Sequence, residues 1–215
     1  MGLNSFQLKC IAVITMIIDH TGAVLFPGEL MFRYIGRISF PIFCFLLTEG
    51  FFHTKDVRKY MLRLGIFAVV SEIPYDLAFR GTVLEFEHQN VFFTLFMGVV
   101  MMYALEKSGE WQVKAVEVFL AMWAADLLCS DYRFKGILLI AVYYFFRERR
   151  WIKHGAGAAW NLLWGQIQMY GALATVPLAF YNGEKGPSMK YFFYLFYPVH
   201  LLALYVISQC LQTVQ

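Results

Sequence analysis

The sequence predicts an all-α fold, a polytopic bundle of about nine transmembrane helices, from three observations. Hydrophobic residues make up 60% of the 215 and charged residues only 15%, whereas roughly a quarter of a soluble domain is charged. The apolar excess extends along the whole chain, in runs close to the roughly 20 residues that a spanning helix needs. Lysine and arginine concentrate between alternate runs. We therefore expect residues 1–215 to form a single integral-membrane domain.

Nine apolar runs are candidate spans. In the first, a single lysine, Lys9, precedes the apolar run that begins at Ile11, and no small-x-small cleavage site follows, so we interpret it as a retained helix. The seventh and eighth are the least defined, because four glycines between 155 and 171 blur the break between them. The predicted spans are residues 6–26, 32–52, 60–80, 90–106, 112–130, 134–147, 152–168, 169–182 and 190–211.

The distribution of basic residues predicts a cytoplasmic N-terminus, because lysine and arginine are enriched on the inner side of membranes. With that orientation, 13 of the 18 basic residues lie in inner segments. Glu85 and Glu87 then fall in an outer segment. Nine spans place the C-terminus outside; eight spans, with the C-terminus inside, are the alternative.

Neither the net charge nor the cysteines indicate a nucleic-acid-binding, disulfide-rich or metal-binding protein. A net charge of +3 gives no indication of nucleic-acid binding. Each of the four cysteines, Cys10, Cys44, Cys129 and Cys210, stands alone among apolar neighbours. Without paired spacing, we interpret them as small core residues rather than metal ligands or disulfide partners. No metal site is predicted.

The first predicted span, IAVITMIIDHTG from Ile11, carries Asp19 and His20 side by side. An ionised carboxylate at bilayer depth costs at least a few kcal/mol, so it must face protein or water. Histidine suits removal of a proton from an amine or a hydroxyl group. Adjacent helical residues point about 100° apart. We therefore expect Asp19 not to contact the His20 ring directly, but to pair with an arginine of the second span or to orient His20 through a third group.

The second predicted span begins with two arginines on one helix face, Arg33 and Arg37. They either extend towards lipid phosphate, or neutralise Asp19 or bind an anionic group of a substrate. Pro41 lacks a backbone donor and is expected to kink or open this helix. Glu49 lies near the opposite end.

The third predicted span places Glu72 and Asp76 four residues apart around Pro74. Two acids beside a helix breaker indicate broken backbone that lines a wet cavity. The alternative is that both pair with Arg63 or Arg80.

Further polar residues fall at the ends of later spans or inside them. Asn90 either caps the fourth helix or lines a chamber. Asp131 and Tyr132 begin the entry to the sixth span. His200 follows Pro198 by two residues and is either a satisfied core histidine or part of a site.

Together these strings resemble the TraX family over essentially the whole chain. The matching strings are IDHTG, RYIGRISFPIFCFLLTEGFFHT, KYMLRL with AVVSEIPYDLAF, QNVFFTL, DYR, YNGEKG and FYLFYPVHL, in that order. The resemblance implies a multi-pass protein of the bacterial cytoplasmic membrane. It also implies an acetyltransferase related to the membrane acyltransferases, which move acetyl from cytosolic acetyl-CoA to an acceptor at the outer face. The family's founding activity is N-acetylation of a conjugative pilin.

The family's usual catalytic candidate is a first-helix histidine, so the resemblance implies a catalytic role for His20, with Asp19 beside it. One position departs from the expected pattern: Arg133 stands where a glycine is expected after DY, which leaves the local backbone geometry open. Other residues in the family's strings are expected to line the chamber or contact the cofactor. They are Arg33, Arg37, Glu49, Glu72, Asp76, Asn90, Asp131, Tyr132, Asn182 and His200.

Three functions are compatible with these residues. The first is acetyl transfer from acetyl-CoA to a pilin N-terminus, another peptide amine, a glycan or a lipid headgroup, with His20 as the base. The second is a proton-coupled transporter of small solutes, which also needs intramembrane acids and histidines. The third is a non-catalytic assembly factor for a pilus or secretion system, in which substitutions of His20 and Asp19 would be tolerated.

Overall fold

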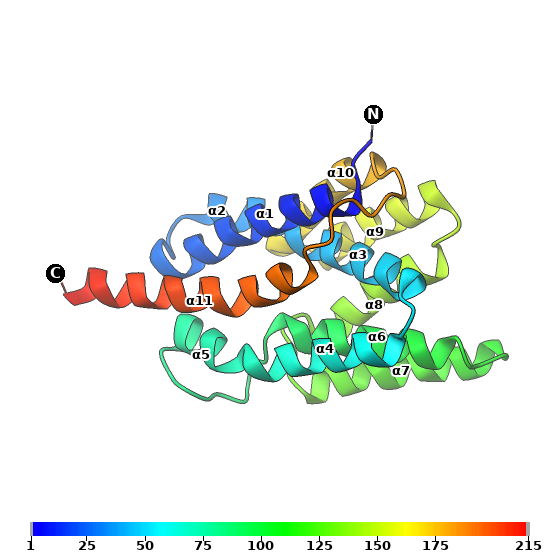
Figure 1. Cartoon of the computed structure of the whole chain (residues 1–215), viewed down its shortest axis with the longest axis horizontal. Helices are drawn as coiled ribbons and strands as arrows, with labels where there is room; N and C mark the ends of the chain where they lie inside the picture. Colours follow the sequence, from blue (N-terminus) through cyan, green and yellow to red (C-terminus); the bar gives the residue numbers. More distant parts are fainter. Residues whose placement is uncertain (1, 214–215) are drawn as a thin grey trace. The chain divides into compact units, whose positions relative to one another are not determined.

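The computed structural model describes residues 2–213 and confirms the all-α prediction for them. They form eleven α-helices and one 3₁₀-helix, with two isolated β-bridges and no strand (Figure 1). The chain divides into two compact units. The first unit comprises Met1–Phe43, Ile73–Leu84 and His154–Gln215, and the second comprises Cys44–Glu72 and Glu85–Lys153.

The first unit is built around α1 (Ser5–Leu25), which packs against α2 (Leu30–Gly36) and α11 (Lys190–Thr213). A capping box begins α1: the Asn4 side chain accepts a hydrogen bond from the Gln7 amide, and the Gln7 side chain accepts one from the Asn4 amide. The 3₁₀-helix η1 (Gln166–Ala174) packs on α2 and on α10 (Thr175–Ala179).

Helices α1 and α11 run side by side in the same direction. At their starts, Leu3 forms a parallel bridge with Tyr181, and the Phe6 and Phe193 ring centroids are 5.9 Å apart. Further along, His20 of α1 meets His200 of α11. Figure 1 shows this parallel course of the first and last long helices.

Two glycines let α1 and α2 approach closely in antiparallel order. A Cβ atom at Gly22 would overlap the Phe32 side chain, and one at Gly36 would overlap the Asp19 side chain. Small residues at such crossings allow close packing of membrane helices. The glycine at 36 therefore brings the backbone of α2 directly against the Asp19 carboxylate.

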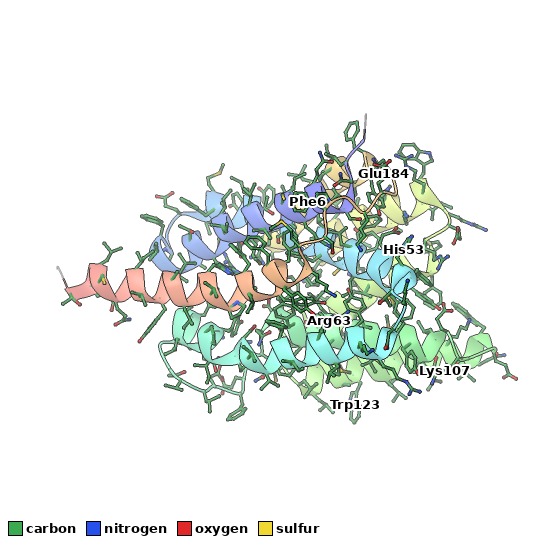
Figure 2. The ribbon with its side chains drawn as sticks, in the orientation of Figure 1. Phe6, His53, Arg63, Lys107, Trp123 and Glu184 are labelled. Atoms are coloured by element: carbon green, nitrogen blue, oxygen red, sulfur yellow. The ribbon has the colours of Figure 1, made fainter. Side chains whose placement is uncertain are left out.

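The second unit contains α4 (Val57–Val70), α6 (Val91–Leu105), α7 (Trp111–Leu127) and α8 (Arg133–Phe145), with α6 packed against the other three. The face of α7 is strongly apolar yet exposed, and Figure 2 shows Trp123 projecting away from this helix. Soluble proteins rarely expose contiguous apolar patches of this kind. The exposed large side chains of α7 are Trp111, Val113, Val116, Phe119, Leu120, Trp123 and Leu127.

Two predicted spans are each divided into two helices, and a proline explains each division. The prediction that Pro41 opens its helix is confirmed: α2 ends at Gly36, and Pro41 is the third residue of α3 (Ser39–His53). Similarly, α4 ends at Val70 and Pro74 is the third residue of α5 (Glu72–Arg80). A proline cannot donate to the carbonyl four residues earlier and clashes with it. The helix therefore opens one turn before the proline.

Within residues 2–213, three helical stretches are long and apolar enough to cross a membrane: Ser5–Leu25, Leu30–His53 and Lys190–Thr213. These apolar stretches indicate a membrane protein. The predicted spans 90–106, 112–130, 134–147 and 152–168 correspond to the shorter helices α6, α7, α8 and α9 (Arg150–Trp164).

The prediction of one helix over 169–182 is wrong. Residues 166–179 form η1 and the short α10 instead. Gly165 precedes η1 with a φ of +74° and Gln166 begins it with +48°, values outside the right-handed helical range. The backbone thus leaves the α-helical path at this point.

We expect Gly22→Val to lower the free energy of unfolding by about 1–3 kcal/mol, because the added carbons must displace Phe32 or separate α1 from α2. Thermal unfolding of the detergent-purified protein measures this change. The control is Gly155→Val in α9, where a Cβ atom meets nothing within 4 Å. Equal transition temperatures for the two variants would show that α1 and α2 do not need the glycine contact.

Candidate active site

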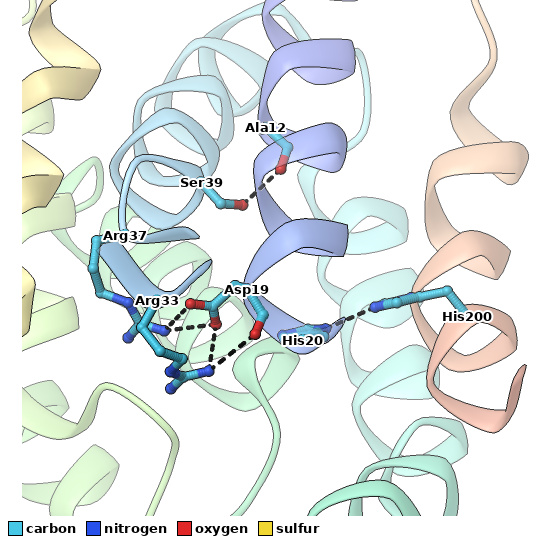
Figure 3. Close-up of polar contacts among 7 residues, drawn as sticks. All are labelled: Ala12, Asp19, His20, Arg33, Arg37, Ser39 and His200. Atoms are coloured by element: carbon cyan, nitrogen blue, oxygen red, sulfur yellow. Dashed lines mark hydrogen bonds and ion pairs between the residues drawn. The ribbon is translucent and has the colours of Figure 1, made fainter. Parts of the chain in front are cut away.

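The Asp19 carboxylate forms a buried ion pair with two arginines: Arg33 in α2 and Arg37, the C-cap residue of that helix. Arg33 Nη1 lies 2.9 Å from Oδ2, and Arg37 Nη2 lies 2.6 Å from Oδ1 (Figure 3). The Asp19 side chain is 8% exposed, and those of Arg33 and Arg37 are 30% and 15% exposed. The prediction that Asp19 pairs with arginines following the first span is confirmed. The alternative, that both arginines only extend towards lipid phosphate, does not describe this geometry.

Local structure explains why both guanidinium groups reach one carboxylate. Arg33 lies in the last turn of α2, and Arg37 is the C-cap residue. Cations are favoured there by the partial negative charge of a helix C-terminus. The Ser39 hydroxyl donates to the Ala12 carbonyl oxygen at 2.8 Å, which ties the start of α3 to α1. The turn between α2 and α3 is thereby fixed against α1.

In this ion pair, two guanidinium groups face one carboxylate. They occupy both oxygens of Asp19. Figure 3 shows Asp19 and His20 pointing to different sides of α1, towards α2 and α11. Asp19 therefore orients the arginines and does not contact the His20 ring.

The His20 ring is hydrogen-bonded to His200, with Nδ1 of His20 2.7 Å from Nε2 of His200. The two ring planes are within 6° and their centroids are 5.0 Å apart. A ring nitrogen lies roughly 1.1 Å from its centroid, so an in-plane N–H···N bond of this length predicts a centroid separation of about 5 Å. The two imidazoles therefore meet edge to edge in one plane.

Aromatic side chains surround the two histidines. Phe79 and Tyr197 present edges to His20, with centroids 5.3 and 5.9 Å away, and Phe196 stacks on His200 at 4.9 Å. Nδ1 of His200 lies 2.9 Å from the Phe196 carbonyl oxygen. These aromatic residues were not predicted as part of the site, although Phe196 and Tyr197 belong to the same sequence motif, FYLFYPVHL, as His200.

A second polar group of predicted residues lies in the second unit. The Asn90 side-chain amide donates to Glu72 Oε2 and to the Ala68 carbonyl oxygen, the latter at 2.7 Å. Its Oδ1 accepts from the Phe92 amide at 3.0 Å, so the predicted capping role of Asn90 is confirmed. Asn90 also satisfies a buried acid.

Two further predicted acids lie elsewhere in helices. Glu49 of α3 has its Oε1 3.8 Å from the Lys153 ammonium nitrogen, and Lys153 lies over the Phe45 ring at 5.0 Å. Asp76 of α5 is fully buried. Because they are four positions apart, Glu72 and Asp76 share one face of α5.

Asn182 builds a turn at the start of α1 rather than joining the histidines. Its Oδ1 accepts from the Glu184 amide at 2.9 Å, and its own amide donates to the Leu3 carbonyl oxygen at 2.9 Å. Because His20 is near the opposite end of α1, Asn182 serves the capping region of this helix in the structure.

Asp131 and Tyr132 lie in the turn before α8, with the Tyr132 amide 3.4 Å from the Thr94 hydroxyl oxygen. Arg133, where a glycine is expected, has a φ of +46°. This left-handed backbone favours glycine. The chain therefore keeps the glycine-like geometry with an arginine.

The structure thus gathers five of the twelve predicted residues into one cluster in the first unit, which we call the α1 cluster: Asp19, His20, Arg33, Arg37 and His200. In the second unit it joins Glu72 to Asn90. Glu49 instead lies near Lys153, Asn182 bonds to Leu3 and Glu184, and the Tyr132 amide lies near Thr94.

We expect Asp19→Asn to lower the free energy of unfolding by about 3 kcal/mol, because it leaves two guanidinium groups facing a neutral amide in a buried site. Chemical or thermal unfolding in detergent measures the loss. The control is Asp56→Asn, which removes the exposed ion pair with Lys59 at 3.4 Å and keeps an N-cap side chain on α4. If both variants were equally stable, the Asp19 pair would be screened by solvent and would not hold α1 to α2.

Comparison with known proteins finds relatives of this chain. The probable fimbrial assembly protein FimC, serogroup H1, of Dichelobacter nodosus is 33% identical, over 94% of each chain. An uncharacterized protein of Rickettsia prowazekii is 30% identical and Protein TraX of Escherichia coli K12 is 24% identical, each over 63% of this chain. This chain spans only about half the length of those two relatives.

No solved structure matches the chain. The family described as TraX protein matches residues 5–208, a range that contains the whole α1 cluster. The chain therefore belongs to the TraX family.

Proposed function

We propose that this protein is a membrane-bound acetyltransferase that moves an acetyl group from cytosolic acetyl-CoA to an amine or hydroxyl acceptor at the outer membrane face. The observation that carries the proposal is the His20–His200 hydrogen bond, enclosed by aromatic rings inside the first unit. A histidine whose orientation is fixed by a second group is the arrangement that general-base catalysis requires.

His20 acts as the general base on the acceptor. When bound, acetyl-CoA supplies an acetyl group activated as a thioester. As the acceptor nitrogen or oxygen bonds to the acetyl carbon, His20 takes the proton that the acceptor loses. The same proton is then available to the leaving thiolate, so His20 ends the cycle neutral. The positive charges of Arg33 and Arg37 stabilise negative charge that develops during transfer.

The basic residues expected on the inner side fit the phosphates and the adenine ring of acetyl-CoA. In the first unit, the Lys9 ammonium nitrogen lies 5.6 Å from the Phe193 ring centroid. Cations beside aromatic faces can bind phosphate while the ring stacks on a base.

The acceptor that we favour is the amino terminus of a pilus protein. The support is a relative that aligns over 94% of this chain and is named a probable fimbrial assembly protein, together with the resemblance to a pilin N-acetylase family. The same relative's name supports a second candidate, a non-catalytic assembly factor for a pilus. A role in assembly alone does not require a base, so the two candidates differ in their dependence on His20.

We further propose nine spans in the bacterial cytoplasmic membrane, with the N-terminus in the cytoplasm. The parallel course of α1 and α11 supports an odd number of crossings, because the first and last spans then run in the same direction. Eight spans would make these two helices antiparallel.

Reporter fusions test this topology. We expect a reporter that is active only outside the cytoplasmic membrane to be active when fused after Gln215 and inactive when fused before Met1. The matched control uses a reporter that is active only in the cytoplasm, which should give the opposite pattern. Both termini on the cytoplasmic side would exclude an odd number of spans and overturn the nine-span proposal.

We expect acetyl-CoA to raise the thermal transition of the detergent-purified protein, and His20→Gln to keep that shift while lowering acetyl transfer by 10²–10⁴-fold. Transfer is measured by mass spectrometry on a synthetic peptide with a free amino terminus. The control is His53→Gln, an exposed histidine whose Nδ1 meets only the Glu49 carbonyl oxygen at 2.8 Å.

Full activity of His20→Gln would remove His20 from the mechanism. Absence of any acetyl-CoA shift in the folded wild-type protein would count against the acetyltransferase and favour the assembly factor or a carrier. A shift without peptide acetylation would place the error in the acceptor class.

A further inference from the structure

We propose that His200 is a positioning residue that holds His20 in a single tautomer, with Nε2 of His20 as the basic nitrogen, and that His200 shares the proton that His20 takes up. The assignment of tautomers rests on geometry alone. Its catalytic meaning rests on the acetyltransferase function proposed above.

The tautomer of His200 follows from its contact with a backbone carbonyl oxygen. Its Nδ1 lies 2.9 Å from the Phe196 carbonyl oxygen, and a carbonyl oxygen can only accept a hydrogen bond. Nδ1 of His200 must therefore carry the hydrogen. A neutral imidazole has one N–H, so Nε2 of His200 presents a lone pair.

The tautomer of His20 follows from that of His200, because the two rings are hydrogen-bonded. Its Nδ1 faces Nε2 of His200 at 2.7 Å with the two rings in one plane. Two lone pairs at this distance would repel each other, so one nitrogen must donate. Because Nε2 of His200 is the acceptor, Nδ1 of His20 is the donor. The lone pair of His20 is then on Nε2.

No other group competes for this assignment. Within residues 2–213, His200 is the only hydrogen-bond partner of the His20 ring. Asp19, the nearest acid in sequence, is committed to Arg33 and Arg37. Phe79 contacts the His20 ring with an apolar edge. The relay therefore runs from the Phe196 carbonyl through two imidazoles to one basic nitrogen.

The proton that His20 takes from the acceptor can be shared with His200 and then returned. When Nε2 of His20 takes a proton from the acceptor, His20 becomes an imidazolium that still donates through Nδ1. The Nδ1 proton can move along the 2.7 Å bond to Nε2 of His200, which then carries the charge and donates to Phe196. Reversal of the same movement returns the proton. A buried charge is costly, and spreading it over two rings lowers that cost.

Nitrogen NMR of the purified protein, labelled with ¹⁵N in its five histidines, tests the tautomers without any activity assay. We expect the protonated nitrogen to be Nδ1 in both His20 and His200, and Nε2 of each to carry none. His200→Phe should remove the His20 preference for Nδ1–H. A hydrogen on Nε2 of His20 in the wild-type protein would overturn the proposal, whatever the enzyme does.

Kinetics of acetyl transfer to the same synthetic peptide test the role of His200. We expect His200→Phe, which keeps a ring but removes the acceptor, to lower kcat roughly 100-fold with KM for acetyl-CoA within about twofold. His200→Gln offers Oε1 as an acceptor for the His20 Nδ1–H and should recover at least about tenfold of the loss.

The matched control is His53→Phe. His53 makes the same ring-to-carbonyl contact four residues back as His200 does, but it has no histidine partner, so its kcat should be unchanged. Wild-type kcat in His200→Phe would overturn the positioning role, as would a folded His200→Gln no better than His200→Phe. If the wild-type protein transferred no acetyl group, the acetyltransferase proposal would fail while the NMR result still decided the tautomers.

Discussion

The ion pair of Asp19 with Arg33 and Arg37 is the constraint on which the first unit depends. A carboxylate with an exposed fraction of 8% needs compensating charge, which Arg33 of α2 and its C-cap residue Arg37 supply. Meeting that need requires α2 to lie directly against α1, which the absence of a side chain at Gly36 permits. The ion pair therefore sets the position of α2.

The same requirement separates the tasks of two adjacent residues. With Asp19 turned towards α2, the helical rotation of about 100° per residue turns His20 towards α11. There it finds another imidazole at 2.7 Å rather than a carboxylate. Asp19 and His20 are adjacent in sequence, but their side chains thus have separate partners in space. The neutral partner, His200, comes from the last long helix, 180 residues further along the chain.

Proline positions explain how the chain changes direction within apolar sequence. Pro41 and Pro74 each stand third in a helix, and the preceding helix ends one turn earlier. The break before Pro41 helps to form the ion pair, because it leaves Arg37 at the end of α2, where its side chain reaches Asp19. A continuous helix would also place Arg33 and Arg37 on one face. It would not offer the C-terminal dipole that favours both cations.

The sequence by itself determined the helical class, the membrane setting and the break at Pro41, and it offered the cap at Asn90 and the pairing of Asp19 with arginines as one alternative each. Each of these follows from short-range rules: periodicity, proline geometry, capping and the cost of a buried charge. The path of residues 166–179 was mispredicted, since glycines permit several backbone conformations. Only the tertiary structure decided that His200 contacts His20 and that Asn182 does not join them. Contacts between helices distant in sequence depend on how whole helices cross, which no local pattern specifies.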